Sequence, residues 1–197
     1  MKLALVALSF VLLTACSKDD GETRRERRAE PRREETTLEL AGIRATVPSG
    51  YERLDEAGRE RLSAAASRRD PGAEVRVAGA QPAGAPIGLV LTHIVHDPAY
   101  GAGYPVSESA RDAEDLARVA AEARGIVADT ERSCGPRSCD VVMTLQGPAL
   151  TTSTHLRMWR VDGRLVEVGC QCMTNDALDT YALPCELPEA PGDATLE

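Results

Sequence analysis

The chain has 197 residues, of which 43% are hydrophobic and only 3% aromatic, and its formal net charge is −8. This length allows one domain of ordinary size with a real hydrophobic core. An acidic, aromatic-poor protein does not suit nucleic-acid binding, which relies on Lys and Arg at phosphates and on aromatic stacking with bases. We therefore expect no nucleic-acid partner.

The first residues are typical of an exported protein. Lys2 supplies a positive start, residues 3–13 form an apolar run, and Leu13-Thr14-Ala15 stands directly before Cys16. A membrane-spanning helix needs roughly 20 apolar residues, about twice the length of this run. The pattern therefore predicts a signal peptide over residues 1–15 that is removed, rather than a transmembrane anchor.

The segment around Cys16 resembles the lipobox of bacterial lipoproteins. The resemblance implies cleavage before Cys16, a diacylglycerol on its thiol and an acyl chain, such as palmitate, on its new amine. Several acyl chains hold a protein stably on a membrane. With Ser17 directly after the cysteine, the pattern resembles that of lipoproteins delivered to the outer membrane. We expect a lipid-anchored envelope protein on the outer membrane, facing the periplasm; a plain secretory peptide is the alternative.

Residues 16–37 are predicted to be the lipidated cysteine and a charged, disordered linker. Residues 17–37 contain seven basic and seven acidic side chains, including three Arg pairs, Arg24-Arg25, Arg27-Arg28 and Arg32-Arg33. A segment without large apolar side chains cannot bury itself, which favours a solvated spacer. The alternative interpretation is contact of the Arg pairs with anionic lipids or cell-wall polymer.

A single folded domain is predicted over residues 38–185. Apolar alternation over residues 38–47 indicates a strand with a bulge or tight turn at Ala41-Gly42. Residues 55–69 indicate a helix with Asp55 as N-cap and Asp70-Pro71-Gly72 as its stop. A short strand over residues 74–80 follows, and then a dense apolar strand over residues 87–96 that suits burial on both faces.

The clearest helix is predicted over residues 107–124, capped by Ser107 or Ser109. Its predicted apolar stripe consists of Ala113, Leu116, Ala120 and Ala123. Glu114 and Arg118 lie one turn apart and are expected to form an ion pair. The acidic residues Asp112, Glu114 and Asp115 are assigned to a solvated face, as such runs usually are.

Four strands are predicted next, over residues 126–132, 139–145, 151–161 and 164–172. Asp162-Gly163 is a strong signal for a two-residue hairpin turn between the last two. Pairing across this turn places Val166, Val168, Cys170 and Cys172 on one buried face. Residues 176–182 indicate a last helix, and residues 186–197 a mobile acidic tail.

Strands that flank helices without strict alternation indicate an α+β fold with a mainly antiparallel sheet. The order of elements, with Val47-Pro48-Ser49-Gly50-Tyr51 after the first strand, resembles the Mog1/PsbP-like sandwich. The resemblance implies a sheet flanked by helices in an α/β/α sandwich. That family includes binding and assembly factors without a shared chemistry, so it implies no particular activity.

Five cysteines remain beside Cys16: Cys134, Cys139, Cys170, Cys172 and Cys185. Export to an oxidising compartment makes disulfides the default, and an odd number leaves one thiol over. We favour a Cys134–Cys139 bridge across the intervening Gly-Pro-Arg-Ser loop. The second bridge is expected to join Cys185 to Cys170 or to Cys172.

A redox role is the alternative interpretation of the first pair. Residues 134–139, Cys-Gly-Pro-Arg-Ser-Cys, resemble the start of a thioredoxin-type site, but the spacing is longer and a strand is predicted to follow. Thioredoxin-type sites use a helix N-terminus to lower the thiol pKa, so the structural bridge is favoured. Zinc binding through Cys170, Cys172, Cys185 and a histidine is less favoured still, because disulfide formation competes with it.

The remaining residues indicate no defined chemistry. His93 and His96 point to opposite faces of one strand, which makes them a poor metal pair, and His155 is the third histidine. Motifs for a serine hydrolase elbow, a zinc protease or a phosphate loop are absent from the sequence. We expect no catalytic residue, no metal and no cofactor.

Three functions stay open. The first is a non-enzymatic binding or assembly module that takes a protein or cell-wall partner on its acidic surface. The second is a membrane-tethered thiol-disulfide oxidoreductase, and the third is a carrier of a small apolar ligand. Of these, the sequence favours the binding module on the membrane.

Overall fold

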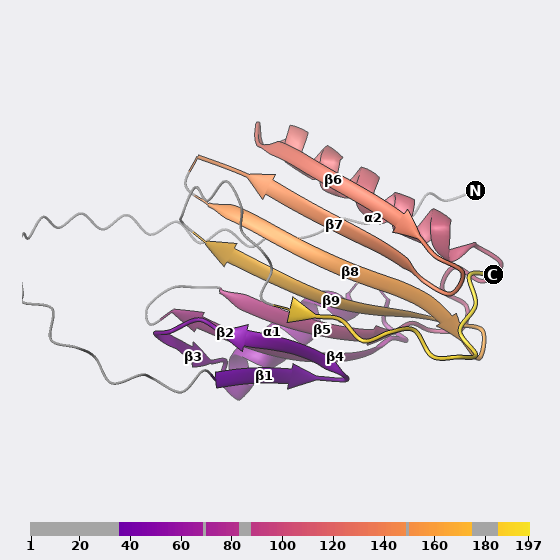
Figure 1. Cartoon of the computed structure of the whole chain (residues 1–197), viewed down its shortest axis with the longest axis horizontal. Coiled ribbons are helices and arrows are strands. Elements are labelled where there is room, and N and C mark those ends of the chain that lie inside the picture. Colours follow the sequence, from indigo (N-terminus) through magenta and orange to yellow (C-terminus); the bar gives the residue numbers. More distant parts are fainter. Residues whose placement is uncertain (1–35, 69, 83–87, 149, 175–184) are drawn as a thin grey trace, which may run out of the picture.

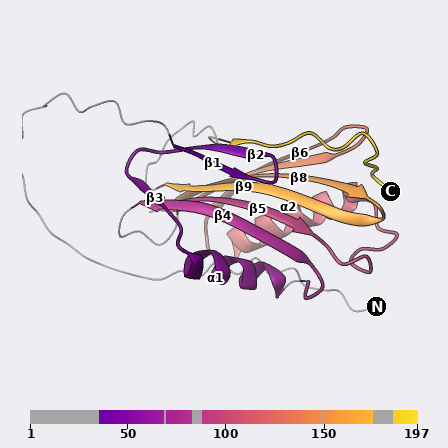
Figure 2. The same cartoon turned by 90° about the horizontal axis from the view of Figure 1, so that it is seen from below.

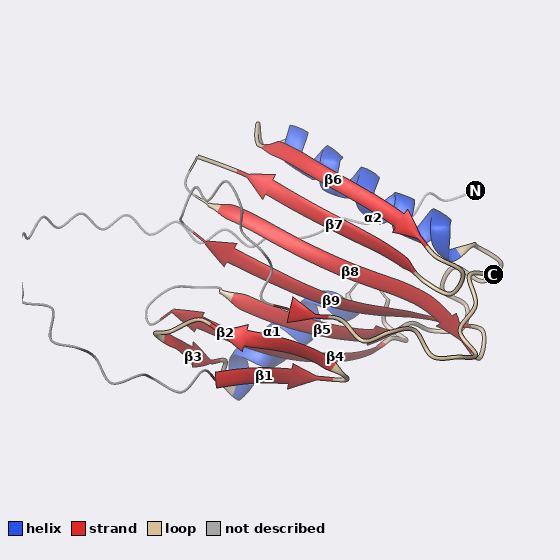
Figure 3. Cartoon of the chain, viewed as in Figure 1, coloured by secondary structure: helices blue, strands red, loops and turns tan. Residues whose placement is uncertain are grey.

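A computed structural model describes residues 36–68, 70–82, 88–148, 150–174 and 185–197. Its strands form a seven-stranded sheet with the order β3-β4-β5-β9-β8-β7-β6 and a three-stranded sheet with the order β1-β2-β10. Neighbouring strands pair antiparallel throughout both sheets. The fold is therefore α+β with a mainly antiparallel sheet, as the sequence predicts, and the described residues contain two helices (Figure 3).

The helices are α1 (Glu56–Ser67) and α2 (Val106–Glu122). The strands of the large sheet are β3 (Tyr51–Arg53), β4 (Glu74–Pro82), β5 (Leu89–Val95), β6 (Val127–Cys134), β7 (Cys139–Gln146), β8 (Thr151–Val161) and β9 (Arg164–Thr174). Those of the small sheet are β1 (Thr36–Leu40), β2 (Ile43–Val47) and β10 (Cys185–Glu186).

Two tight turns set the register of their hairpins. Ala41 and Gly42 have φ angles of 48° and 84°, and Asp162 and Gly163 have φ angles of 50° and 73°. Two central residues with positive φ match the right-handed twist of the flanking strands. The tight-turn alternative at Ala41-Gly42 and the hairpin at Asp162-Gly163 are both confirmed by the pairing on either side.

The layers differ from the helix–sheet–helix order that the sequence suggests. Among the described residues, α1 packs on β4, and α2 packs on β6, β7 and β8. Figure 2 shows both helices on one side of the large sheet and β1 and β2 on the other. The expected α/β/α layering is therefore not found in the described part of the chain. A sequence pattern marks an element as amphipathic without saying which face of a sheet it covers.

The core has two parts, one on each side of the large sheet. Between the sheets, the buried side chains include Ile43, Leu89, Leu91, Trp159 and Val168. Under α2, Val106 and Ala110 pack against side chains of β7, β8 and β9. Complete burial of a Val or Leu side chain stabilises the fold by about 1.5–3 kcal/mol. The inter-sheet part contains more buried side chains than the part under α2, so it contributes more of the apolar stabilisation. The predicted buried face of β9 is confirmed by Val166, Val168, Cys170 and Cys172, all at most 3% exposed.

The first helix begins as predicted and the second does not. Asp55 caps α1, since its carboxylate accepts a hydrogen bond of 2.7 Å from the backbone N–H of Gly58. Pro105 occupies the N-cap position of α2 without a side-chain hydrogen bond, so the caps predicted at Ser107 or Ser109 are wrong. Proline fixes φ near its helical value and lets the helix start without them.

The apolar stripe of α2 is displaced by one position from the prediction. Its buried residues are Val106, Ala110, Glu114, Ala117 and Ala121. The predicted stripe of Ala113, Leu116, Ala120 and Ala123 is only half-buried, and Ala123 is exposed. The assignment of Glu114 to a solvated face is also wrong, because the residue is only 8% exposed. Because a charged residue, Glu114, lies within the buried stripe, the apolar pattern alone did not locate that stripe correctly.

The C-terminal segment after β10 packs against the domain. The backbones of Arg160 and Thr195 exchange hydrogen bonds of 2.9 and 3.0 Å, and Leu196 accepts one from Val106 at the start of α2. Ala190 and Ala194 are buried. This packing differs from the mobile tail that the sequence suggests over residues 186–197. The predicted helix over residues 176–182 lies outside the described residues.

Two cysteine pairs lie at disulfide distance. Cys134 and Cys139 join the ends of β6 and β7, and Cys170 joins β9 to Cys185 of β10, with Cα–Cα distances of 4.1 and 6.4 Å. Cys172 is buried and lies outside both pairs. The favoured pairing at Cys134–Cys139 fits this geometry, and of the two partners left open for Cys185 the structure selects Cys170.

We predict that the two bridges stabilise the fold unequally. Their sequence separations are 5 and 15 residues, and chain-entropy estimates give about 2 kcal/mol for the shorter loop and about 3 kcal/mol for the longer. The double variant Cys170→Ala/Cys185→Ala should therefore lose more unfolding free energy in urea than Cys134→Ala/Cys139→Ala, its matched control. The reverse order would contradict this assignment.

Candidate functional site

The large sheet has an open area on the side that faces the small sheet. The small sheet contacts β4, β5 and β9, and Figure 1 shows no described helix or strand over β6 and β7 on the same side. Asp129 and Glu131 of β6 are exposed there, and they lie opposite Thr144 and Val142 of β7. Residues paired in register share a face. We call this area, formed by residues 127, 129, 131 and 133 of β6 and residues 140, 142, 144 and 146 of β7, the open face.

The open face combines apolar and acidic side chains. Val127 is 65% exposed and Val142 is 39% exposed. Asp129 and Glu131 form no ion pair within the described part of the chain. The open face therefore presents two apolar side chains and two carboxylates to solvent.

One carboxylate on the open face is neutralised. Asp140 Oδ1 accepts a hydrogen bond of 2.9 Å from Nε of Arg157 and lies 2.8 Å from Nε2 of His155. Arg157 also donates to the backbone oxygen of Pro188, 2.9 Å away, in the C-terminal segment. This group fixes the border between the open face and the packed segment.

The opposite side of β6 is held by a buried carboxylate. Glu114 of α2 accepts hydrogen bonds from Thr130 Oγ1 at 3.0 Å, Arg132 Nε at 3.2 Å and Arg118 Nη2 at 2.6 Å. The predicted pair of Glu114 and Arg118 is thus confirmed, but as part of a larger cluster that reaches the edge strand. Thr130 and Arg132 alternate with Asp129 and Glu131, so one side of β6 is fixed while the other faces solvent.

The surroundings of Glu114 favour its ionised form. Burial alone would raise the pKa of this carboxyl group, but the hydrogen bonds from Thr130 and Arg132 and the charges of Arg118 and Arg132 outweigh burial. The pKa of Glu114 therefore lies below the ordinary value of 4.5. A buried carboxylate in this state needs all of its partners, because an unpaired buried charge is strongly destabilising.

A second cluster of ionisable side chains lies where β5 ends. His96 is 4% exposed, and its Nδ1 is 3.1 Å from Oδ2 of Asp70, which also accepts a hydrogen bond from the backbone N–H of Asp97. His96 Nε2 makes no hydrogen bond and lies 3.8 Å from Oε2 of Glu167. The ring of Tyr100 stacks on the imidazole at 4.2 Å. The imidazole is thus enclosed by protein groups on both nitrogens.

A buried arginine closes the same end of the sheet. Arg160 is 3% exposed and donates hydrogen bonds to the backbone oxygens of Gly101, Tyr104 and Gly163. These bonds hold the loop between β5 and α2 against the β8–β9 hairpin. Together with His96 and Asp70, Arg160 therefore joins loops to the sheet instead of presenting a reactive group to solvent.

The remaining histidine, His93, lies on β5 and is half-buried. Burial and the positive charge of Arg76 lower its pKa from 6.5, and Glu74 opposes them only in part. His93 and His96 are separated by the backbone of the strand end, so they do not form a common site. Among the side chains described by the structure, no three His, Cys, Asp or Glu residues converge on a position for a metal ion.

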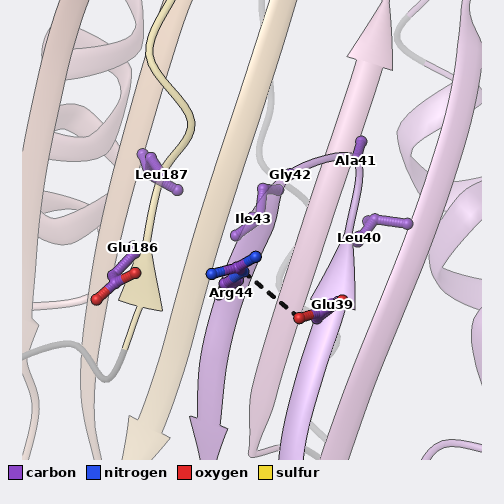
Figure 4. Close-up of a pocket in the computed structure, with 8 residues that line it drawn as sticks. All are labelled: Glu39, Leu40, Ala41, Gly42, Ile43, Arg44, Glu186 and Leu187. Atoms are coloured by element: carbon purple, nitrogen blue, oxygen red, sulfur yellow. Dashed lines mark ion pairs between the residues drawn. The ribbon is translucent and has the colours of Figure 1, made fainter.

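A shallow pocket of about 350 Å³ lies at the β1–β2 turn (Figure 4). Its wall includes the turn at Ala41 and Gly42, the ion pair of Arg44 and Glu39 at 3.4 Å, and residues 186–187 at the end of β10. Both charged side chains are about two-thirds exposed, at 67% and 66%. Such a charged, open depression does not fit a carrier of small apolar ligands, which enclose them in apolar walls.

The cysteines that the sequence predicts as functional sites lie in different environments. Cys16, the predicted lipidation site, lies outside the described residues. Cys139 is buried and opens strand β7, while Cys134 is exposed. No helix begins at this pair, so the thiol environment of a thioredoxin-type site is missing there.

Sequence reasoning missed the buried polar residues Asp70, Glu114, Arg160 and Glu167. For one of them, Glu114, the sequence does contain a sign of burial. The apolar residues at positions 106, 110, 117 and 121 follow helical spacing, and Glu114 occupies the gap in that series. A charge at a core position indicates a buried partner, but the partners Thr130 and Arg132 lie on a separate strand.

Comparisons with known proteins found no similarity: no protein-family profile, curated protein or solved structure matches this chain. Neither of the two described helices has the length and apolar character needed to cross a bilayer.

We predict that Glu114→Gln lowers the unfolding free energy by about 1–3 kcal/mol near neutral pH, because hydrogen bonds to a charged group are lost. The pKa of Glu114 is lowered on folding, so its contribution is complete above about pH 4.5. The contribution is lost as the pH falls through the folded-state pKa. The unfolding free energies of the wild type and Glu114→Gln, plotted against pH, should therefore converge there. Asp115→Asn is the control, because Asp115 is 59% exposed and 3.9 Å from Arg118. Equal losses in the two variants would contradict the role of Glu114.

Proposed function

We propose that the protein is a lipid-anchored, non-enzymatic binding module of the bacterial cell envelope. The observation that carries the proposal is the open face, where exposed Val127 and Val142 lie beside the unneutralised Asp129 and Glu131. This surface is held in place by the Glu114 cluster on its other side. The buried side chains of His96, Asp70 and Arg160 hold loops against the sheet. The polar groups that remain accessible on the open face therefore suit the binding of a partner.

The proposed location rests on the first 16 residues. The apolar run followed by Leu13-Thr14-Ala15-Cys16 supports lipidation of Cys16 and cleavage before it. Two cysteine pairs at disulfide distance fit an oxidising compartment. Ser17 supports delivery to the outer membrane, with the domain on the periplasmic side.

A distant relation to the Mog1/PsbP-like sandwich is part of this proposal. The turn of residues 47–51 and the long helix before a C-terminal antiparallel meander support it. The placement of both described helices on one face of the sheet is the feature that departs from it. Because that family includes binding and assembly factors, the relation agrees with a binding module without naming its partner.

The membrane anchor is tested with Cys16→Ser. The wild-type chain should remain in the membrane fraction after a high-salt wash and carry a lipid mass increment on Cys16 in intact-mass spectra. The variant should lose both properties, since a chain without acyl groups lacks a stable hold on the bilayer. Cys172→Ser is the matched control, because it makes the same change at a cysteine inside the folded domain. A wild-type protein without lipid would overturn the anchor.

The binding surface is tested by site-specific photocrosslinking in intact cells. A photoreactive amino acid at Val142, on the open face, should give a reproducible crosslinked protein band. The same group at Val119 should not, although Val119 is 61% exposed on the outer side of α2. Crosslinks of equal yield from both positions, or none from Val142, would count against the open face as a protein-binding surface.

A further inference from the structure

The outer edge of β6 is an open strand edge of unusual length. β6 has eight residues, and the large sheet ends with it among the described strands. The other edges are short or blocked: β3 has three residues, β10 has two, and Arg53 donates a hydrogen bond of 2.9 Å to the backbone oxygen of Thr37 in β1. Proteins usually shorten, bulge or block such edges, because unpaired backbone groups accept a further strand.

The β6 edge is regular and held in place. All eight residues pair in unbroken register with β7, from Val127 opposite Gln146 to Cys134 opposite Cys139. Glu114 holds Thr130 and Arg132 from the helix side, and the Cys134–Cys139 pair closes the hairpin. A strand that is already ordered loses little conformational entropy on accepting another, which favours strand addition.

The charges along β6 favour a basic occupant. Asp129 and Glu131 are exposed on the open face, whereas the positive charge of Arg132 is met by Glu114 on the helix side. A strand added at this edge would place every second side chain beside Asp129 and Glu131. Opposite charges in cross-strand positions stabilise a sheet, so Arg or Lys fits these positions.

The same charges disfavour the central pairings with a second copy of this chain. An antiparallel pair of β6 strands that keeps both open faces on one side and is centred on Thr130 sets Asp129 opposite Glu131 of the copy. Centring on Glu131 sets the two Glu131 side chains opposite each other. Like charges in directly opposite positions destabilise a sheet, so the registers with the longest overlap are disfavoured for a second copy.

From this edge we infer that β6 binds an extended basic segment of a partner protein, which adds to the large sheet as an eighth strand. The segment has Arg or Lys at alternate positions facing Asp129 and Glu131. This inference rests on the proposed function and names the chemistry of its partner. Backbone hydrogen bonds supply the affinity, and the carboxylates select the sequence.

The test uses the full chain in detergent micelles and the probe peptide acetyl-Val-Arg-Val-Arg-Val-Arg-Val-amide. Hydrogen exchange should slow at backbone amides of β6 when the peptide binds. Asp129→Asn/Glu131→Gln should weaken binding about 2- to 30-fold, from two lost cross-strand pairs. The control Glu56→Gln/Glu60→Gln removes the same charge from exposed positions on α1 and should leave the affinity unchanged.

A peptide of the same sequence with alternate N-methylated residues separates strand addition from simple charge attraction. It should lose binding, because N-methylation removes the backbone donors of one peptide edge. Equal affinity for both peptides, or no slowed exchange in β6, would overturn the inference. If β6 is protected without peptide and loses that protection when residues 17–35 are deleted, the Arg-rich linker is the occupant and a partner strand is excluded. Photocrosslinking from Val142 judges the proposed function independently of these outcomes.

Discussion

The hydrogen-bonded charge cluster at Glu114 is the interaction on which the surface of this protein depends. The buried stripe of α2 consists mainly of alanines, whose small side chains bury little apolar area against the sheet. Glu114 adds a directional link to Thr130 and Arg132 in the last strand of the sheet. A buried carboxylate is tolerated only when its partners are in place. The helix and the edge strand therefore fix each other, and the orientation of Asp129 and Glu131 toward solvent follows from the alternation of side chains along β6.

The two faces of the large sheet are covered by different means, and this determines where a surface stays open. Large aliphatic side chains and Trp159 pack between the two sheets over β4, β5, β8 and β9. Cys170 and Cys185 tie the small sheet to β9, which limits how far it extends across the large sheet. β6 and β7 lie beyond that limit, and on the other face they are covered mainly by α2. The open face is thus a consequence of a small second sheet on a wide first one.

The sequence predicted those features that depend on neighbouring residues. Asp162-Gly163 fixes a hairpin because only a few residue types adopt positive φ, and Asp55 caps α1 through a contact three residues away. The alternation from Val166 to Cys172 likewise follows from strand geometry. The features it could not supply depend on distant partners. The buried stripe of α2 differs from the prediction because Glu114, a charged residue, is buried with partners on β6. The C-terminal segment packs through backbone hydrogen bonds to Arg160, which no particular residue type predicts.

The distribution of polar groups supports the proposed binding function. His96, Asp70 and Arg160 are buried, and their polar atoms mostly contact other protein groups: a carboxylate, backbone N–H groups or loop oxygens. A general base must instead reach a substrate proton, and the Nε2 of His96 faces Glu167 inside the protein. The exposed carboxylates Asp129 and Glu131 lie side by side on one face of an edge strand. Fixed charges on a sheet surface suit a macromolecular partner, whose own side chains supply the complementary charges. The location of these unneutralised charges at the edge of the sheet therefore supports the proposed binding function.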